Sequence, residues 1–110
     1  MQKLTVIEYL QDGKSPFEKW FERLDSIASA KVATALYRME QGNLSNVKSV
    51  GKGVFEYKID FGPGYRIYFG KAGNELIILL CGGSKKTQSE DIKKAQTAWQ
   101  QYKTDKKIKN

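Results

Sequence analysis

The chain has 110 residues, of which 19 are basic and 12 are acidic, so its formal net charge is +7 at pH 7. This length fits one domain with one core and leaves no room for a separate catalytic domain. The lack of histidine and the single cysteine exclude a ribonuclease of the two-histidine type and an internal disulfide, and they argue against a metal site. No apolar run reaches the roughly 18–20 residues of a membrane span, and the first ten residues do not resemble a signal peptide, so we expect a cytoplasmic protein without membrane contact.

The basic charge is distributed unevenly along the chain. Residues 1–40 hold six basic and six acidic side chains, whereas residues 41–110 hold 13 basic and six acidic ones. The whole excess therefore lies in the second part. Such asymmetry indicates a polyanionic partner, usually nucleic acid. The alternative is a basic surface that only keeps the protein soluble.

In chain order, the first predicted element is a strand at residues 3–9, where polar and apolar side chains alternate up to the turn-forming sequence QDGK. The sequence SPFE that begins at Ser15 is a capping box and predicts the start of a helix. Asp25 can cap a second helix, and Gly42 is a typical helix terminator. Because each of these helices has one apolar face, they are predicted to form a helical hairpin.

Three strands are predicted next, at residues 47–59, 65–69 and 75–81, with a break allowed in the first near residues 51–53. The connecting sequences FGPG and KAGN are short, which favours an antiparallel meander. Thr87 or Ser89 can cap a final helix, whose apolar residues recur at spacings of three and four.

Together these elements predict an α+β fold with the order β-α-α-β-β-β-α. A mainly antiparallel, twisted sheet is expected to pack against the N-terminal helical hairpin and the C-terminal helix. Residues 1–110 are predicted to form a single domain, and residues 104–110 are interpreted as a frayed basic tail.

Alternation within residues 51–70 sorts the side chains of the predicted hairpin onto two faces. The apolar residues point to one face, and Glu56, Lys58, Arg66 and Tyr68 point to the other. We expect the first face to be buried and the second to be exposed to solvent.

Further basic residues are expected near this exposed face. Lys52 is assigned to the same face, and Lys85 and Lys86 follow the adjacent last strand, so all three are predicted to converge with Lys58 and Arg66. Such a cluster can neutralise phosphates. A positioned arginine or lysine can also stabilise the charge that develops on a phosphorane during RNA cleavage.

Two residues on this face have alternative interpretations. Glu56 could act as a general base toward a ribose 2′-hydroxyl, or it could only form a cross-strand salt bridge with Lys58 or Arg66. Tyr68 could stack on a base or help to position a phosphate, or it could be an ordinary half-buried strand tyrosine. Away from this face, Cys81 lies in an apolar run, which predicts a buried, inert thiol.

The segments FGPGYRIYF and LLCGGSKKTQ, with LDS and RMEQGNLSNVKSVGKGVFE upstream, resemble the RelE/HigB-like toxins of bacterial toxin–antitoxin modules. The similarity covers roughly residues 4–102 and is strongest to the subgroup called addiction-module killer proteins. The resemblance implies a RelE-like α+β fold related to small microbial ribonucleases. In the best-known branch, such toxins enter the ribosomal A site and cleave translated mRNA.

By position, the family's strand lysine corresponds to Lys58, its Gly-Tyr-Arg arginine to Arg66, and its base after the last strand to Lys85 or Lys86. Two positions depart from the RelE branch, because Glu56 replaces a basic residue and the tyrosine of the C-terminal helix is absent. The glutamate brings the chain closer to toxins that use a carboxylate as base.

The resulting hypothesis is a type II toxin that acts as a ribosome-dependent mRNA endonuclease without a metal or small-molecule cofactor. Its expected partners are a cognate antitoxin, the ribosome and mRNA. The superfamily also contains ParE-type inhibitors of DNA gyrase, which gives a noncatalytic alternative, and a nontoxic nucleic-acid-binding module is a second one. The assigned roles are transition-state stabilisation by Arg66 with Lys85 or Lys86, phosphate binding by Lys52 and Lys58, and proton abstraction by Glu56.

Overall fold

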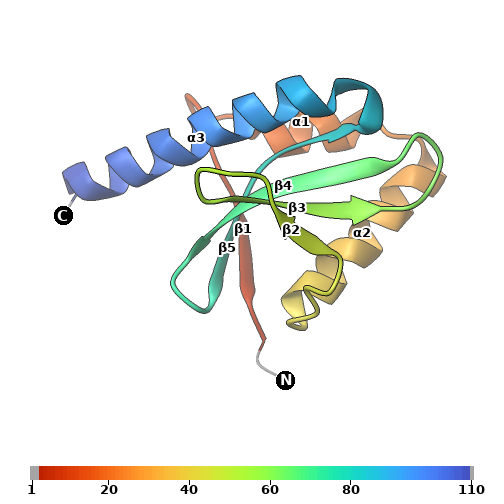
Figure 1. The fold of residues 1–110 in the computed structure, drawn as a ribbon, viewed down its shortest axis with the longest axis horizontal. Helices are drawn as coiled ribbons and strands as arrows, with labels where there is room; N and C mark the ends of the chain where they lie inside the picture. The colour runs from red at the N-terminus through yellow and green to blue at the C-terminus, as the bar shows by residue number, and fades with distance from the viewer. Residues whose placement is uncertain (1–2, 110) are drawn as a thin grey trace.

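The computed structural model describes residues 3–109, with the side chains of residues 3–106. The five strands form one sheet in the order β1-β5-β4-β3-β2, in which only β1 runs parallel to its neighbour (Figure 1). The predicted α+β class is confirmed. The strands are β1 (Thr5–Glu8), β2 (Val47–Ser49), β3 (Val54–Ile59), β4 (Tyr65–Ala72) and β5 (Leu76–Ser84). The helices are α1 (Pro16–Glu22), α2 (Ser26–Glu40), the short 3-10 helix η1 (Lys85–Thr87) and α3 (Gln88–Lys109).

The two N-terminal helices begin where the sequence predicts, and α2 ends near the predicted Gly42. The Ser15 hydroxyl accepts a hydrogen bond from the Glu18 N–H at 2.9 Å, and the Asp25 carboxylate accepts one from the Ala28 N–H at 2.8 Å. Each bond satisfies a backbone donor that the first helical turn cannot pair internally. After α2, Gly42 has a φ of +83°, a left-handed conformation that glycine adopts without strain.

The segment of residues 47–59 forms two strands. Gly51, Lys52 and Gly53 have positive φ values of +94°, +56° and +82°, so the chain reverses its direction between β2 and β3. β2 then pairs antiparallel with β3 and adds a fifth strand at the edge of the sheet. The predicted break is confirmed, but the predicted order with three strands after the helical hairpin is wrong because it merges β2 with β3.

Helices cover both faces of the sheet. One face packs against α1 and α2, and the buried residues of this core are Phe17, Val32, Ala35, Met39, Tyr57, Ile67, Phe69, Ile77 and Leu79. The other face packs against α3, with Tyr9, Val54, Tyr68, Ile78, Leu80, Cys81, Ala95 and Trp99 buried there. Alternation therefore assigns the hairpin residues to the correct faces. The expectation that the face of Glu56, Arg66 and Tyr68 is exposed is wrong, because α3 covers it.

Two glycines allow tryptophan rings to lie directly on the sheet. A Cβ atom at Gly70 would overlap the Trp99 ring on the α3 side, and a Cβ atom at Gly82 would overlap the Trp20 ring on the opposite side. The close approach of α3 to β4 therefore depends on the missing side chain at Gly70.

The last helix is longer than predicted. It continues to Lys109, and residue 110 lies outside the described residues. The interpretation of residues 104–110 as a frayed tail stays a prediction. A hydrogen bond of 2.8 Å from the Gln101 amide to the Asp105 carboxylate joins successive turns in this region. Figure 1 shows that the C-terminal half of α3 extends beyond the sheet. Within residues 3–109, no helix combines the length and the apolar character needed to cross a bilayer.

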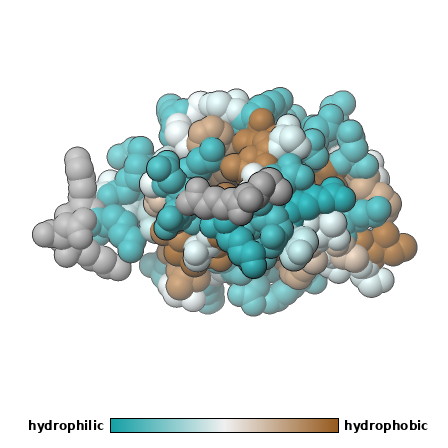
Figure 2. All heavy atoms as spheres, turned by 90° about the horizontal axis from the view of Figure 1, so that it is seen from below, coloured by the Kyte–Doolittle hydropathy of each residue, from teal (hydrophilic) through white to brown (hydrophobic). Residues whose placement is uncertain are grey.

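Large hydrophobic side chains on the surface are dispersed. On the face seen from below, Figure 2 shows hydrophobic atoms as separate patches among hydrophilic ones. Scattered apolar residues of this kind are usual on protein surfaces. The most exposed large hydrophobic residues of the described chain are Ile7, Leu10, Ile27 and Tyr37.

We expect Gly70→Ala to lower the free energy of unfolding by about 1–3 kcal/mol, because the added methyl group has no space beneath Trp99. Urea denaturation followed by circular dichroism measures this change. In a Trp99→Ala background the same substitution should cost much less, since the ring is gone. An equal cost in both backgrounds would show that α3 does not lie directly on β4.

Candidate functional site

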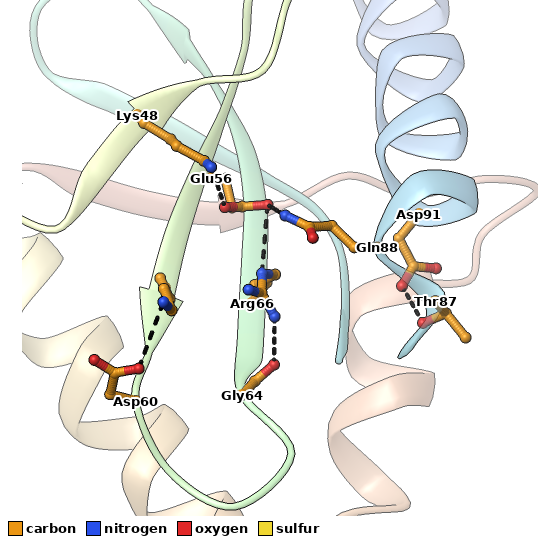
Figure 3. A network of polar contacts seen from close by, with 9 residues as sticks. Lys48, Glu56, Asp60, Gly64, Arg66, Thr87, Gln88 and Asp91 are labelled. Carbon is orange, nitrogen blue, oxygen red and sulfur yellow. Dashed lines mark hydrogen bonds and ion pairs between the residues drawn. The ribbon is translucent and has the colours of Figure 1, made fainter. Parts of the chain in front are cut away.

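A buried carboxylate lies on β3, between β4 and the edge strand β2. Glu56 of β3 is only 1% exposed. Its Oε2 atom accepts a hydrogen bond from Nε2 of Gln88 at 2.8 Å and lies 3.7 Å from Nε of Arg66 (Figure 3). Its Oε1 atom lies 3.7 Å from Nζ of Lys48. Strands β2 and β4 and the start of α3 therefore each provide one polar contact to β3.

Strand register brings these residues together. Lys48 is opposite Glu56 in the pairing of β2 with β3, and Tyr68 is opposite Glu56 in the pairing of β3 with β4. Arg66 lies two residues before Tyr68 in β4 and so shares the same face. Gln88 is the first residue of α3, the helix that covers this face.

The contact with Arg66 is energetically different from the contact with Lys48. Moving an ion from water into a protein costs several kcal/mol of solvation, which opposite charges and hydrogen bonds must offset. The Arg66 side chain is 6% exposed, so its attraction to Glu56 acts at low dielectric, whereas the Lys48 side chain is 67% exposed and screened by water. Arg66 is therefore the main counter-ion of Glu56, and Gln88 supplies the close hydrogen bond.

The guanidinium of Arg66 is only partly engaged. Its Nη1 atom donates a hydrogen bond to the Gly64 carbonyl at 2.8 Å, and its Nε atom is buried without a hydrogen-bond partner. No hydrogen bond of its Nη2 atom is found among the described residues, and the whole residue is 5% exposed. A guanidinium with an unused donor suits phosphate oxygens.

Tyr68 lies beside Glu56 and beneath α3. Its side chain is fully buried, and its hydroxyl lies near the Glu56 carboxylate without a hydrogen bond of good geometry to any described residue. Burial, and after it the negative charge of Glu56, raise the pKa of Tyr68, so the phenol stays protonated at neutral pH. The expectation that Tyr68 stacks on a base is wrong for this conformation, because no face of its ring is exposed.

Two of the predicted basic residues, Lys58 and Lys85, lie near Arg66. Lys58 is opposite Arg66 in the register, and its half-exposed ammonium lies 3.6 Å from a carboxylate oxygen of Asp60. The backbone N–H of Lys85 donates to a carbonyl of the turn between β3 and β4 at 3.4 Å, which places Lys85 beside the turn that precedes Arg66. Lys85 and Lys86 are both exposed.

Lys52 does not join this group. It lies in the turn between β2 and β3 and borders a separate groove with Lys93 and Gln96 of α3. Gln96 follows Gln88 by eight residues, or about 12 Å along a helix. The predicted convergence of Lys52 with Arg66 is wrong, because a turn residue with positive φ does not lie on the face of the strand.

Sequence reasoning misses two contacts of Glu56. Lys48 is absent from the predicted site because its strand was merged with β3, so that their antiparallel register could not be derived. Gln88 gave a weak signal, since it follows the candidate cap Thr87 at the start of the last helix. Its position over β3 depends on tertiary packing that alternation alone does not reveal.

Cys81 is a structural thiol. Burial and then the negative charge of Asp91 raise its pKa to about 12, well above the usual 9.0. The prediction that this thiol is buried is confirmed. Since the thiolate is the reactive form, a raised pKa lowers its reactivity. Among the described residues, no group of three or more cysteine, aspartate or glutamate side chains is placed to hold a metal ion.

The model of the family described as "Phage derived protein Gp49-like (DUF891)" matches residues 19–103. The chain belongs to this family. The Gp49-like family is associated with toxin–antitoxin modules, and the matched residues include the whole Glu56 and Arg66 centre. An uncharacterized protein of Haemophilus influenzae is 45% identical over 80 residues, which cover 72% of this chain and 81% of that relative.

We expect Gln88→Ala to lower the free energy of unfolding of this Gp49-like protein by about 1.5–3 kcal/mol, because it removes a hydrogen bond to a buried ionised group. Urea denaturation measures the effect. Gln100→Ala, at an exposed position of the same helix, is the matched control and should change stability by less than about 0.5 kcal/mol. Equal effects of the two substitutions would contradict a structural role for Gln88.

Alkaline pH should destabilise the protein through Cys81. The unfolded chain loses the thiol proton near its usual pKa of 9.0, whereas the folded chain holds it until about 12, so rising pH favours the unfolded state between these values. The slope for this one group is at most about 1.4 kcal/mol per pH unit. Denaturation curves at pH 8 to 11 should show a shallower loss for Cys81→Ala. Identical pH dependence in the two proteins would rule out the raised pKa.

Proposed function

We propose that this protein is the toxin of a type II toxin–antitoxin pair and acts as a ribosome-dependent mRNA endonuclease that arrests translation. The observation that carries the proposal is the guanidinium of Arg66, which lies 3.7 Å from a buried carboxylate and uses only Nη1 for a hydrogen bond among the described residues. Lys58 and Lys85 lie beside it. Membership of a family associated with toxin–antitoxin modules supports this function.

Arg66 is proposed to hold the scissile phosphate. During cleavage of an RNA backbone, phosphorus becomes five-coordinate and its equatorial oxygens gain negative charge. A guanidinium that is already fixed by its protein contacts stabilises this charge without reorganising. Lys58, Lys85 and Lys86 add positive charge around it, which favours the approach of a polyanion.

Cleavage also requires a base and an acid. Glu56 is proposed to accept the proton of the ribose 2′-hydroxyl, whose oxygen attacks phosphorus while the bond to the 5′-oxygen breaks. Lys85 or Lys86 is proposed to donate a proton to the departing 5′-oxygen. The products are a 2′,3′-cyclic phosphate and a 5′-hydroxyl end, so the atoms and protons balance without a metal ion.

This role for Glu56 requires a local opening. With 1% of Glu56 exposed, a ribose can reach the carboxylate only after the Gln88 side chain or the first turn of α3 moves aside. The hydrogen bond from Gln88 to Oε2 is a single contact, so rotation of one side chain would release that oxygen. If Glu56 instead only orients Arg66, the opening must still expose the guanidinium, because the Arg66 side chain is 6% exposed.

A cognate antitoxin is the proposed protein partner. The cationic residues around Arg66 must be masked in a resting cell, because a toxin of this kind stops translation. An antitoxin with an acidic contact surface would pair with Lys58, Lys85 and Lys86 and block the access of RNA.

The test is primer extension on cellular transcripts after brief induction of the protein. We expect new 5′ ends within translated regions. Arg66→Lys keeps the charge but lacks the planar guanidinium, and we expect it to reduce cleavage by about 100-fold or more. Arg38→Lys, at an exposed position of α2, is the matched control and should cleave like the parent protein. Intact transcripts together with DNA breaks and an SOS response would instead indicate a gyrase inhibitor.

Glu56→Gln separates the two roles of the carboxylate. As the base, its replacement should abolish cleavage while ribosome binding persists. If Glu56 only orients Arg66, Glu56→Gln should leave measurable cleavage. In that background Arg66→Lys should reduce cleavage by a smaller factor than in the parent protein. The folded fraction must be measured in parallel by circular dichroism, because the substitution leaves the buried Arg66 charge without its counter-ion.

A further inference from the structure

The C-terminal half of β5 has one open edge. β5 pairs with β4 along its length, but β1 reaches only Leu76–Leu79 on the other side. Beyond that, no described strand pairs with this edge of β5. Helix α1 lies on one side of the edge, with Trp20 against Gly82, and the first turn of α3 lies on the other, with Asp91 against Gly83. A groove of about 570 Å³ lies between them. Its volume is within the about 300–1,000 Å³ of small-molecule sites.

A buried carboxylate borders this groove. Asp91 is 8% exposed, and its Oδ2 atom accepts a hydrogen bond from the Thr87 hydroxyl (Figure 3). No other hydrogen bond of the Asp91 side chain is found among the described residues. Asp91 also forms no ion pair with a described lysine or arginine. A carboxylate in this state offers acceptor capacity to a ligand with N–H donors.

The remainder of the groove combines aromatic and basic side chains. Trp20 and Tyr65 meet edge to face with ring centroids 6.2 Å apart, and both are only partly buried. Lys19 and Arg23 of α1 and Lys94 of α3 lie at its exposed borders. Aromatic rings for stacking, cations for phosphate and a polar group for the base edge are the elements with which proteins recognise a nucleotide of single-stranded RNA.

The carboxylate favours one base. Guanine presents two adjacent donors, N1–H and the N2 amino group, on its Watson–Crick edge. Each oxygen of a carboxylate has two lone pairs, so Asp91 can accept both donors through Oδ1 and the second lone pair of Oδ2 while it keeps its bond to Thr87. Adenine and cytosine present one amino group beside an acceptor nitrogen, which a carboxylate repels. Each good bidentate pairing discriminates against the wrong base by roughly 1–3 kcal/mol.

The groove is adjacent to the proposed catalytic centre. Gly83, which lies against Asp91, is the direct partner of Arg66 in the pairing of β4 with β5. Lys85 comes directly after Ser84, the last residue of this strand. A nucleotide in the groove would therefore lie on the strand next to the one that carries the phosphate-binding arginine.

We infer that the groove between α1 and α3 binds a guanine nucleotide next to the cleaved phosphate, with Asp91 reading the base and Lys19, Arg23 and Lys94 holding its phosphates. This inference rests on the proposed function for its biological meaning. The protein would then be a nuclease with a sequence preference. Asp91 would determine this preference, and the catalytic centre would not.

Calorimetric titration of the whole protein with the four ribonucleoside 5′-monophosphates tests the inference. We expect GMP to bind at least about tenfold more tightly than AMP, CMP or UMP, and Asp91→Asn to remove this preference. Glu90→Gln removes one negative charge at the neighbouring exposed position, and this variant should retain the preference for GMP. Equal affinity for all four nucleotides, or an unchanged preference in Asp91→Asn, would overturn the inference.

Because Asp91 also binds Thr87, its substitution can impair folding, so a second variant is needed. The double variant Lys19→Ala, Arg23→Ala should lower the affinity for all four nucleotides by a similar factor and keep the preference for GMP. Unchanged affinities would exclude phosphate binding in the groove. Arg66→Lys should bind GMP normally while it loses cleavage. A preference for GMP without any cleavage would refute only the proposed function, and cleavage without a guanine preference would refute only this inference.

Discussion

The buried charge of Glu56 is the interaction on which the site depends. A carboxylate in the middle of a sheet is stable only if nearby groups offset its lost hydration, and the structure provides Arg66 from β4 and Gln88 from α3 for this purpose. These contacts require the register of β3 with β4 and the placement of the first turn of α3. The same pair fixes the guanidinium of Arg66, so the requirement for stability and the arrangement for anion binding come from one interaction.

Close packing of α3 creates the low-dielectric environment of this pair. Trp99 lies on the backbone of β4 because residue 70 is glycine, and Ala95 and Tyr68 fill the adjacent space. The helix thereby protects the charges from water, which strengthens their attraction. The helix also limits access to Glu56. The site therefore contains an arginine in a fixed orientation and a carboxylate that stays buried until the start of α3 moves away.

Local rules predict much of the fold, and the errors concern the turn at residues 51–53 and long-range packing. The caps at Ser15 and Asp25 and the division of the hairpin residues between two faces follow from short-range chemistry, and they are correct. The exposure of the Glu56 face was predicted wrongly, since alternation cannot tell whether a distant helix will cover a face. Lys52 was misplaced because its positive φ depends on a turn that separates two strands, and Gln88 was missed because its contact spans 32 positions.

A double-mutant cycle between Glu56 and Arg66, measured by urea denaturation, tests the central claim most directly. Glu56→Gln, Arg66→Met and the double variant are compared with the parent protein. If the two groups form a buried pair, each single substitution leaves an unpaired buried charge or donor, and the double variant should be more stable than additivity predicts by roughly 1–3 kcal/mol. Additive effects would contradict the claim that a buried ion pair organises the site.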